Sequence, residues 1–184
     1  MPITELDPTA ALIVVDLQAG TLGAPTAHSA TDVLGDAVEV IAAFRERDLP
    51  VVLANVSGTP SGRTAYGAGA REFPSEWSAL VPELEAQDSD IRVTRATWSA
   101  FAGTDLDATL RGRGVTQVVI VGVATSFGVE STARAAYDLG YSVAVVEDAI
   151  TDRSLDSHEA SVARVFPALG QVGTAAEVLG VLVA

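Results

Sequence analysis

The sequence contains no cysteine, and this excludes disulfide bonds, thiolate-bound metals, iron–sulfur clusters and a thiol nucleophile. Aromatic residues make up only 5% of the chain, so we expect a core of Val, Leu, Ile and Ala. Side chains of this size suit a sheet that is covered by helices on both faces. Positive charge is also scarce, because 11 Lys and Arg stand against 24 Asp and Glu. The net charge of −13 predicts repulsion from nucleic acids and from anionic membranes.

Long apolar runs are missing as well. No uninterrupted run approaches the roughly 18 residues that a membrane-spanning helix needs. The polar segment Met1 to Pro8 lacks the basic and apolar stretches of a secretory signal. We therefore expect a cytoplasmic protein without membrane contact. The 184 residues fit one domain, residues 1–184, with no repeat, low-complexity tract or interdomain linker.

Apolar runs of strand length alternate along the chain with segments of helical period. The predicted strands are Ala10–Val15, Pro50–Val56, Ile91–Thr94, Val118–Val121, Val143–Val146 and Gln171–Gly173. The predicted helices are Thr31–Asp48, Leu106–Arg113, a segment from Val129 that ends at Gly140, Ser157–Val165 and a terminal helix that holds Glu177–Leu182. A loop rich in Gly, Ser and Pro is expected from Ser57 to Pro74. This order predicts a doubly wound, three-layer α/β/α fold of Rossmann-like type, with a mainly parallel six-stranded sheet.

Ligands of such sheets bind beyond the carboxyl ends of the strands, where the strand order reverses. Three places meet this rule: Asp16, Arg95 and the segment Gly122–Gly128. Asp16 is either a residue that fixes a loop or a catalytic acid or base. Arg95 is either an ordinary surface arginine or part of the site. The segment is either a simple strand–helix turn or a helix start whose N–H groups stabilise an anion.

With these residues together, the chain resembles the isochorismatase-like hydrolases, which include isochorismatases, nicotinamidases and N-carbamoyl amidases. The similarity runs from about residue 8 to residue 182 and implies the fold of that family. It also implies a cis peptide bond between Val123 and Ala124. The matching stretches are Ala11–Gln18, Trp98–Phe101, Gly103–Leu106, Gly122–Thr125, Val129–Arg134, Asp148–Ala149 and His158.

In most of that family, an Asp, a Lys and a Cys form the catalytic triad. The resemblance places Asp16 at the first position, Arg95 at the lysine position and Gly128 at the cysteine position. Amide-hydrolysing members need the thiolate. With glycine at this position, the sequence resembles the true isochorismatases. In those enzymes the acid protonates a vinyl ether, and water adds without a covalent intermediate. A guanidinium beside Asp16 favours the carboxylate and opposes this protonation, unless burial offsets it; alternatively, Arg95 binds a substrate carboxylate.

Other residues are candidates for binding a small-molecule substrate. We expect Gln18 to orient a ligand, and Ala124 and Thr125 to lie against it. The aromatic side chains of Trp98, Phe101 and Phe127 form an apolar wall or, alternatively, belong to the core. In the loop, Arg63 and Tyr66 either close over an anionic substrate or are merely solvated.

The sequence predicts neither a metal nor a cofactor. Nicotinamidase-like relatives bind zinc through an Asp and two His in the loop after the second strand. Here residues 55–69 contain no histidine and no acidic residue. Of the two histidines, His158 is expected at the start of a surface helix and His28 in a polar loop.

The leading hypothesis is a metal-free hydrolase that acts on a small carboxylated, isochorismate-like vinyl ether. A second is a catalytically inactive relative that binds a small ligand or serves as a scaffold, since two of three triad positions differ. A third is a serine hydrolase, because Ser126 resembles a nucleophile elbow and is followed by Asp148 and His158. Relatives commonly form dimers or tetramers, so we also expect a homo-oligomer.

Overall fold

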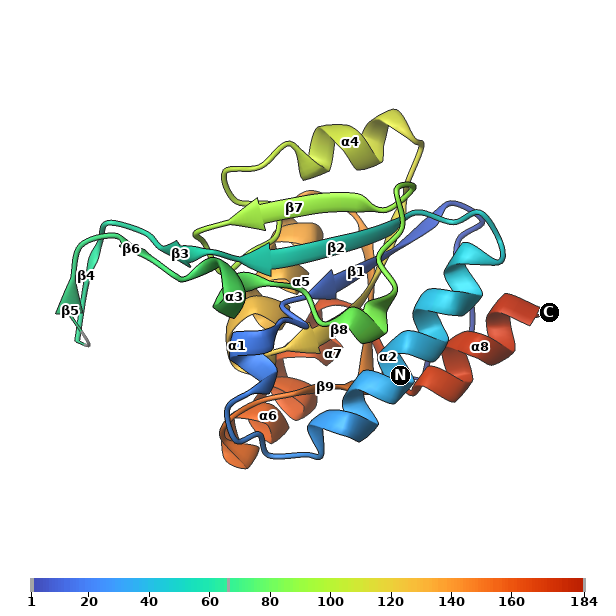
Figure 1. Cartoon of the computed structure of the whole chain (residues 1–184). Coiled ribbons are helices and arrows are strands. Elements are labelled where there is room, and N and C mark those ends of the chain that lie inside the picture. The colour runs from blue at the N-terminus through green and yellow to red at the C-terminus, as the bar shows by residue number, and fades with distance from the viewer. Residues whose placement is uncertain (1, 66, 184) are drawn as a thin grey trace.

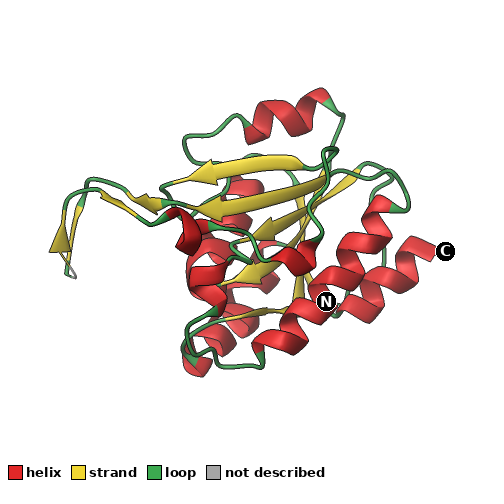
Figure 2. Cartoon of the chain, viewed as in Figure 1, coloured by secondary structure: helices red, strands yellow, loops and turns green. Residues whose placement is uncertain are grey.

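A computed structural model describes residues 2–65 and 67–183, so that Tyr66, one of the expected loop residues, lies outside the described part. Its centre is a sheet of six parallel strands in the order β10-β9-β8-β1-β2-β7. Figure 1 labels β7, β2, β1, β8 and β9 of this sheet, and Figure 2 shows strands in yellow. The predicted α/β fold with a mainly parallel six-stranded sheet is therefore confirmed. The strands are β1 Ala10–Val15, β2 Val51–Val56, β7 Ile91–Arg95, β8 Gln117–Val123, β9 Ser142–Thr151 and β10 Gln171–Gly173.

Helices cover both faces of this sheet. On each face, apolar side chains of the strands and of the helices form one buried cluster. Helix α2 is an example of how these helices form. At its start, the side chain of Ser29 accepts a hydrogen bond from the N–H of Asp32. Ala37, Ile41 and Phe44 lie on the side of the helix that is buried against the sheet. Helices α2 and α8 pack on one face, and α4, α5 and α7 on the other. The α-helices are α1 Ala19–Leu22, α2 Ala30–Arg45, α3 Ser75–Ser78, α4 Leu106–Gly112, α5 Glu130–Asp138, α6 Leu155–Ala160, α7 Phe166–Leu169 and α8 Ala175–Val183.

Three short segments complete the helical part of the chain. A 3₁₀ turn spans Pro82–Leu84, and π-helical segments span Thr125–Val129 and Ser161–Val165. The first π-helical segment runs directly into α5, and the second follows α6 directly, within the range that the sequence predicts as the helix Ser157–Val165. No helix among residues 2–65 and 67–183 combines the length and the apolar character needed to cross a membrane.

The strand order reverses between β1 and β8, which pair in parallel at the middle of the sheet. From β1 the chain continues to β2 and β7 on one side, and from β8 to β9 and β10 on the other. Gly122 permits the close pairing of β8 with β1, since a Cβ there would lie 1.9 Å from the carbonyl oxygen of Val15. The carboxyl ends of β1, β7 and β8 therefore bring Asp16, Arg95 and Ala124 to one edge of the sheet.

The predicted loop Ser57–Pro74 contains an extended antiparallel arm, which we define as residues 58–72. Strand β3 (Gly58–Thr59) pairs with β6 (Arg71–Glu72), and β4 (Arg63–Thr64) pairs with β5 (Gly67–Ala68). The arm projects from the body of the protein at the left of Figure 1. Strands of two residues are too short to show an alternating pattern, so the sequence predicts only a loop here.

Strand β9 is longer than predicted. Its pairing with β8 shifts register after Ile120 and then continues to Thr151. Glu147 and Asp148, which the sequence places at the end of this strand, therefore lie within it. The true end of β9 brings Asp152 and Arg153 to the edge where Asp16 lies.

Candidate functional site

Asp16 and Arg95 form a buried ion pair at the carboxyl edge of the sheet. Nη1 of Arg95 lies 2.7 Å from Oδ1 of Asp16, and Nη2 lies 3.0 Å from Oδ2. Nη2 also donates to the carbonyl oxygen of Trp98 at 2.8 Å. Both residues are buried, with 5% and 4% of their surfaces exposed. Arg95 is thus no surface arginine, and its two-point contact fixes the orientation of the Asp16 carboxyl group.

The backbone turns sharply at Asp16 to present this carboxyl group. The φ angle of Asp16 is +51°, in the left-handed region that only some polar residues adopt readily. Its N–H donates to the carbonyl oxygen of Ala54, and its own carbonyl oxygen accepts from the N–H of Gln18 and the hydroxyl of Thr21. The strand end therefore holds Asp16 through backbone contacts on two sides.

Burial raises the pKa of Asp16 above its ordinary value of 3.8. The hydrogen bonds and the positive charge of Arg95 act in the opposite direction, but the loss of solvation is the larger effect. The sequence leaves open whether burial of Asp16 offsets the effect of Arg95 on its pKa, and in the structure burial does so. A carboxyl group with a raised pKa holds a proton more readily than an exposed aspartate does.

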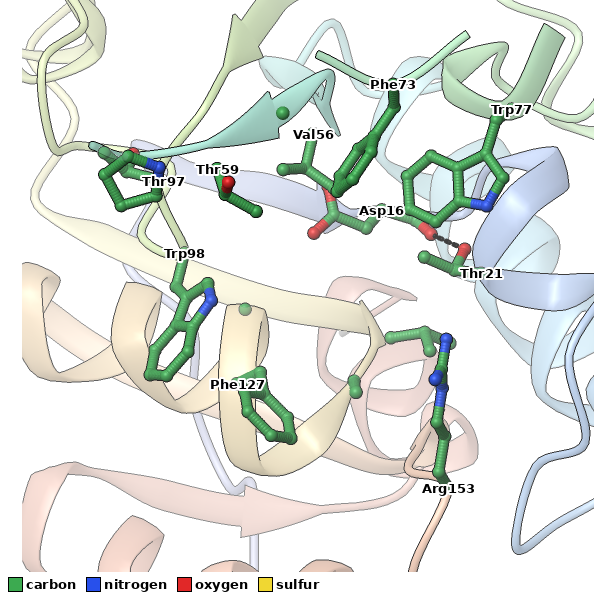
Figure 3. Close-up of a pocket in the computed structure, with 15 residues that line it drawn as sticks. Asp16, Thr21, Val56, Thr59, Phe73, Trp77, Thr97, Trp98, Phe127 and Arg153 are labelled. Atoms are coloured by element: carbon green, nitrogen blue, oxygen red, sulfur yellow. Dashed lines mark hydrogen bonds between the residues drawn. The ribbon is translucent and has the colours of Figure 1, made fainter. Parts of the chain in front are cut away.

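Asp16 faces a cavity of about 310 Å³, shown in Figure 3. Its walls are mostly apolar, and Asp16 and Arg153 are the two charged residues among those that line it. This size and character suit one small molecule with an anionic group. The lining residues are Asp16, Thr21, Val56, Gly58, Thr59, Pro60, Phe73, Trp77, Thr97, Trp98, Val123, Ala124, Phe127, Gly128 and Arg153.

Gly128 lies directly over the ion pair. A Cβ at this position would lie 3.0 Å from Oδ2 of Asp16, 2.9 Å from Cγ1 of Val15 and 3.5 Å from Nη2 of Arg95. These distances place the residue that the resemblance assigns to the triad next to the other two. The glycine leaves the space over the carboxyl group open.

Several of the residues expected from the sequence meet at this cavity. Trp98 and Phe127 form one wall, with ring centroids 4.9 Å apart in an edge-to-face arrangement. Ala124 follows the cis peptide bond of Val123, which the resemblance implies and the structure contains. Arg95 lies behind Asp16 and does not line the cavity itself.

Gln18 does not face the cavity, contrary to our expectation. Its side chain is fully buried, and Oε1 accepts from the N–H of Val56 at 2.8 Å. Its Nε2 donates to the carbonyl oxygens of Val56 at 3.0 Å and Trp77 at 3.3 Å. Gln18 therefore holds together the segments that carry Val56 and Trp77, two residues of the cavity wall, instead of contacting a ligand.

Thr125 and Phe101 also point away from the cavity. The hydroxyl of Thr125 is buried and lies 2.9 Å from Nδ1 of His158. Phe101 belongs to the core and stacks on Tyr141, with ring centroids 5.8 Å apart. The expectation of a surface position for His158 is also wrong, because only 7% of its surface is exposed. Their side-chain directions follow from packing that the sequence does not show.

Ser126 is held by Asp152 and not by the partners that a serine hydrolase requires. Oδ2 of Asp152 accepts from the N–H of Ser126 at 2.7 Å and from its hydroxyl at 2.8 Å. Asp148 accepts from the N–H of Ala175, and His158 contacts Thr125. The predicted set of Ser126, Asp148 and His158 is therefore not assembled. The helix-start N–H of Ser126, expected to face a ligand, is taken by Asp152.

Arg153 is a cavity residue that the sequence does not predict. It follows Asp152 at the end of β9, and its side chain lines the cavity on the side away from Trp98 in Figure 3. Its backbone N–H donates to Oδ1 of Asp152, but its guanidinium has no hydrogen-bond or ion-pair partner among the residues that the structure describes. Apolar and polar residues do not alternate through residues 147–151, so the sequence gives no sign that this arginine follows a strand end.

Groups suited to metal binding do not gather here. Within the described ranges, no three His, Asp or Glu side chains are placed so that they could hold a metal ion. All 11 basic residues of the chain are arginines, so no lysine of this chain takes the place of Arg95. The chemistry of the cavity thus centres on three groups. These are the Asp16 carboxyl group, the Arg95 guanidinium paired with it, and the Arg153 guanidinium, which has no partner among the described residues.

Comparisons with known proteins find a family model and relatives that span most of this chain. A family model described as "Isochorismatase domain" matches residues 10–177. The chain is 38% identical over 176 residues to the uncharacterized isochorismatase family protein YwoC of Bacillus subtilis, covering 92% of each chain. An isochorismatase family protein of Burkholderia thailandensis is similar in structure, with a TM-score of 0.94, 42% identity and coverage of 99% of this chain and 100% of that one. The N-carbamoylsarcosine amidase of Thermoplasma acidophilum has a TM-score of 0.77 at 29% identity, over 91% and 96% of the two chains.

Proposed function

The chain belongs to the isochorismatase family, and we propose that it is a hydrolase that cleaves a small carboxylated vinyl ether by acid catalysis at Asp16. The observation that carries the proposal is the position of Asp16. Its carboxyl group has a raised pKa and faces a cavity that is also lined by Gly128, the residue that the resemblance assigns to the family's cysteine position. An acid there transfers a proton, and no residue at that position attacks the substrate.

The reaction begins with protonated Asp16, which gives its proton to the terminal carbon of the enol ether. The resulting oxocarbenium ion takes up one water molecule at the adjacent carbon, and the proton that this water loses returns to the Asp16 carboxylate. The hemiketal then collapses: its hydroxyl loses a proton as the carbonyl of pyruvate forms, the carbon–oxygen bond to the leaving group breaks, and the departing oxygen takes up a proton to leave as an alcohol. One water is consumed, and no covalent enzyme intermediate forms.

The unpaired guanidinium of Arg153 supports binding of the substrate carboxylate. The sequence offers Arg95 for this task, but its Nη1 and Nη2 atoms are already bonded to Asp16 and to the carbonyl oxygen of Trp98. Arg153 is free of such contacts among the described residues and lines the same cavity as Asp16. A planar guanidinium pairs with a carboxylate in a fixed orientation, which would hold the reacting carbon toward Asp16.

Thiolate-based amide hydrolysis is not available to this chain. The amidase among its structural relatives carries an amide-hydrolysing activity in its name, but the present sequence contains no cysteine. Gly128 supplies no nucleophilic atom at the corresponding place. A proton-transfer mechanism fits the residues that remain.

A second candidate function is that of an inactive relative that binds a small carboxylate. The two-point contact between Arg95 and Asp16 favours it, because this geometry suits the ionised form of Asp16, which has no proton to donate. Such a protein would be stabilised by a ligand that it leaves intact.

The two functions are separated by a direct assay. The purified chain is incubated with isochorismate, and released pyruvate is measured with lactate dehydrogenase and NADH. Hydrolysis predicts pyruvate release that Asp16→Asn abolishes and that the exposed control Asp88→Asn retains. Thermal stabilisation by isochorismate without pyruvate release would instead identify a binding protein. Equal pyruvate release by the wild type and Asp16→Asn would contradict the assignment of the acid.

A further inference from the structure

A second cavity of about 360 Å³ adjoins the first one at the base of the arm. The two cavities share four lining residues: Thr59, Pro60, Trp98 and Phe127. The rest of the second cavity is lined by residues of the arm: Gly62, Thr64, Ala65, Gly67, Gly69 and Arg71. A molecule that fills the first cavity can therefore extend past the shared wall and under the arm.

The shared wall has the character of a binding surface for a planar group. Trp98 is 55% exposed and Phe127 is 46% exposed, although both are large apolar side chains. Figure 3 shows their rings side by side at the edge of the Asp16 cavity. Adjacent exposed aromatic rings are costly in water and are typical of surfaces that a ligand covers. Small residues of the arm, including Gly62 and Gly69, leave space opposite these rings.

The charge of the arm differs from that of the rest of the chain. The chain carries a net charge of −13, but no acidic residue occurs between Asp48 and Glu72, so that Glu72 at its end is the one acidic residue in the sequence of the arm. Two arginines, Arg63 and Arg71, lie in this interval, and only Arg71 lines the second cavity. In the described part of the chain, the Arg71 guanidinium has no acidic partner. An anionic group in this cavity would meet a cation that has no other counterion.

We propose that the second cavity is a distal subsite that binds a planar, apolar group ending in a carboxylate. Trp98 and Phe127 contact the planar group, and Arg71 pairs with the carboxylate. This inference rests on the proposed function, since it assigns to the Asp16 site an elongated substrate with one anionic end near Arg153 and the other near Arg71. The arm then sets the length of the molecules that the site accepts.

The test compares two probes and four forms of the full chain by isothermal titration calorimetry. The probes are biphenyl monocarboxylate and the biphenyl dicarboxylate with a carboxylate at each para end. The wild type is compared with Arg71→Gln, with Trp98→Ala and with Arg63→Gln. The last variant removes the same charge from the same arm, outside both cavities.

We expect the wild type to bind the dicarboxylate about tenfold more tightly than the monocarboxylate, as a charge-assisted contact provides. Arg71→Gln should remove this difference without weakening monocarboxylate binding, and Arg63→Gln should retain it. Trp98→Ala should weaken both probes. Equal affinity of the wild type for both probes, or an equal loss in the two arginine variants, would overturn the subsite. Because the probes are not hydrolysed, this result is independent of the pyruvate assay.

Discussion

Gly128 and Asp16 are placed so that a Cβ on the glycine would lie 3.0 Å from Oδ2 of the carboxyl group. The same Cβ would lie 2.9 Å from Cγ1 of Val15, and both contacts are tighter than ordinary van der Waals distances. The absence of a side chain at residue 128 therefore does more than remove a nucleophile. It also leaves open the space over the acid that a substrate carbon occupies in the proposed reaction.

Gly128→Ala should lower kcat/KM for vinyl-ether cleavage by about tenfold, because the new methyl group occupies the space over Asp16 and shifts the acid by a few tenths of an ångström. The matched control is Gly35→Ala, on the exposed side of α2, where a Cβ would have no neighbour within 4 Å. This control should leave activity unchanged and raise the free energy of unfolding by up to about 1 kcal/mol, through helix propensity. Steady-state kinetics and urea denaturation measure both effects. Full activity of Gly128→Ala would show that the space is not used.

Activity should fall as the pH rises, because the mechanism needs protonated Asp16. Burial raises the pKa of this group, so the midpoint of the falling limb of kcat should lie above 3.8. Arg95→Gln removes the charge that lowers this pKa and should move the midpoint to still higher pH. The pH dependence of kcat in the two proteins measures this shift. A midpoint that stays in place or moves to lower pH in the variant would contradict the assignment of Asp16 as the acid.

Arg153→Gln should raise KM for the carboxylated substrate by about tenfold and change kcat less, because the guanidinium contributes a charge-assisted bond to the bound carboxylate. The control Arg164→Gln removes an exposed arginine from the second π-helical segment and should alter neither constant. The methyl ester of the substrate provides a further comparison. If Arg153→Gln affected acid and ester equally, the residue would not recognise the carboxylate.

Gln18→Leu should destabilise the protein by about 2–4 kcal/mol, because it leaves three part-buried backbone groups without their partner: the N–H of Val56 and the carbonyl oxygens of Val56 and Trp77. Urea denaturation measures the loss, and the exposed control Gln87→Leu should stay within about 0.5 kcal/mol of the wild type. A direct ligand contact by Gln18 predicts the opposite result, with a raised KM and unchanged stability.

Much of the fold was predictable from local pattern alone. The strands β1, β2 and β8 are continuous apolar runs, and helix α2 repeats its apolar residues at helical spacing, so their positions follow from neighbouring residues. The position of Asp16 directly after β1 is also a property of the sequence. Its resemblance to a known family identifies Arg95 and Gly128 as its partners, and the structure brings the three together.

Local pattern did not predict the direction of individual side chains. Gln18, Phe101 and Thr125 lie close in sequence to residues of the cavity wall, but each is turned toward a partner that is distant in the chain. Arg153 enters the cavity only because β9 continues through a register shift beside β8. The pairing within the arm likewise depends on strands of two residues, which have no recognisable period.

The amino-acid sequence by itself therefore determined the layers of the fold, the edge at which the site lies and the absence of a thiol, because these depend on composition and on spacing along the chain. Only the tertiary structure decided that burial outweighs Arg95 in setting the pKa of Asp16, that Arg153 lines the same cavity as Asp16 and that two cavities meet at Trp98 and Phe127. Solvation and side-chain direction depend on contacts between segments far apart in the chain, and those contacts exist only once the sheet has formed.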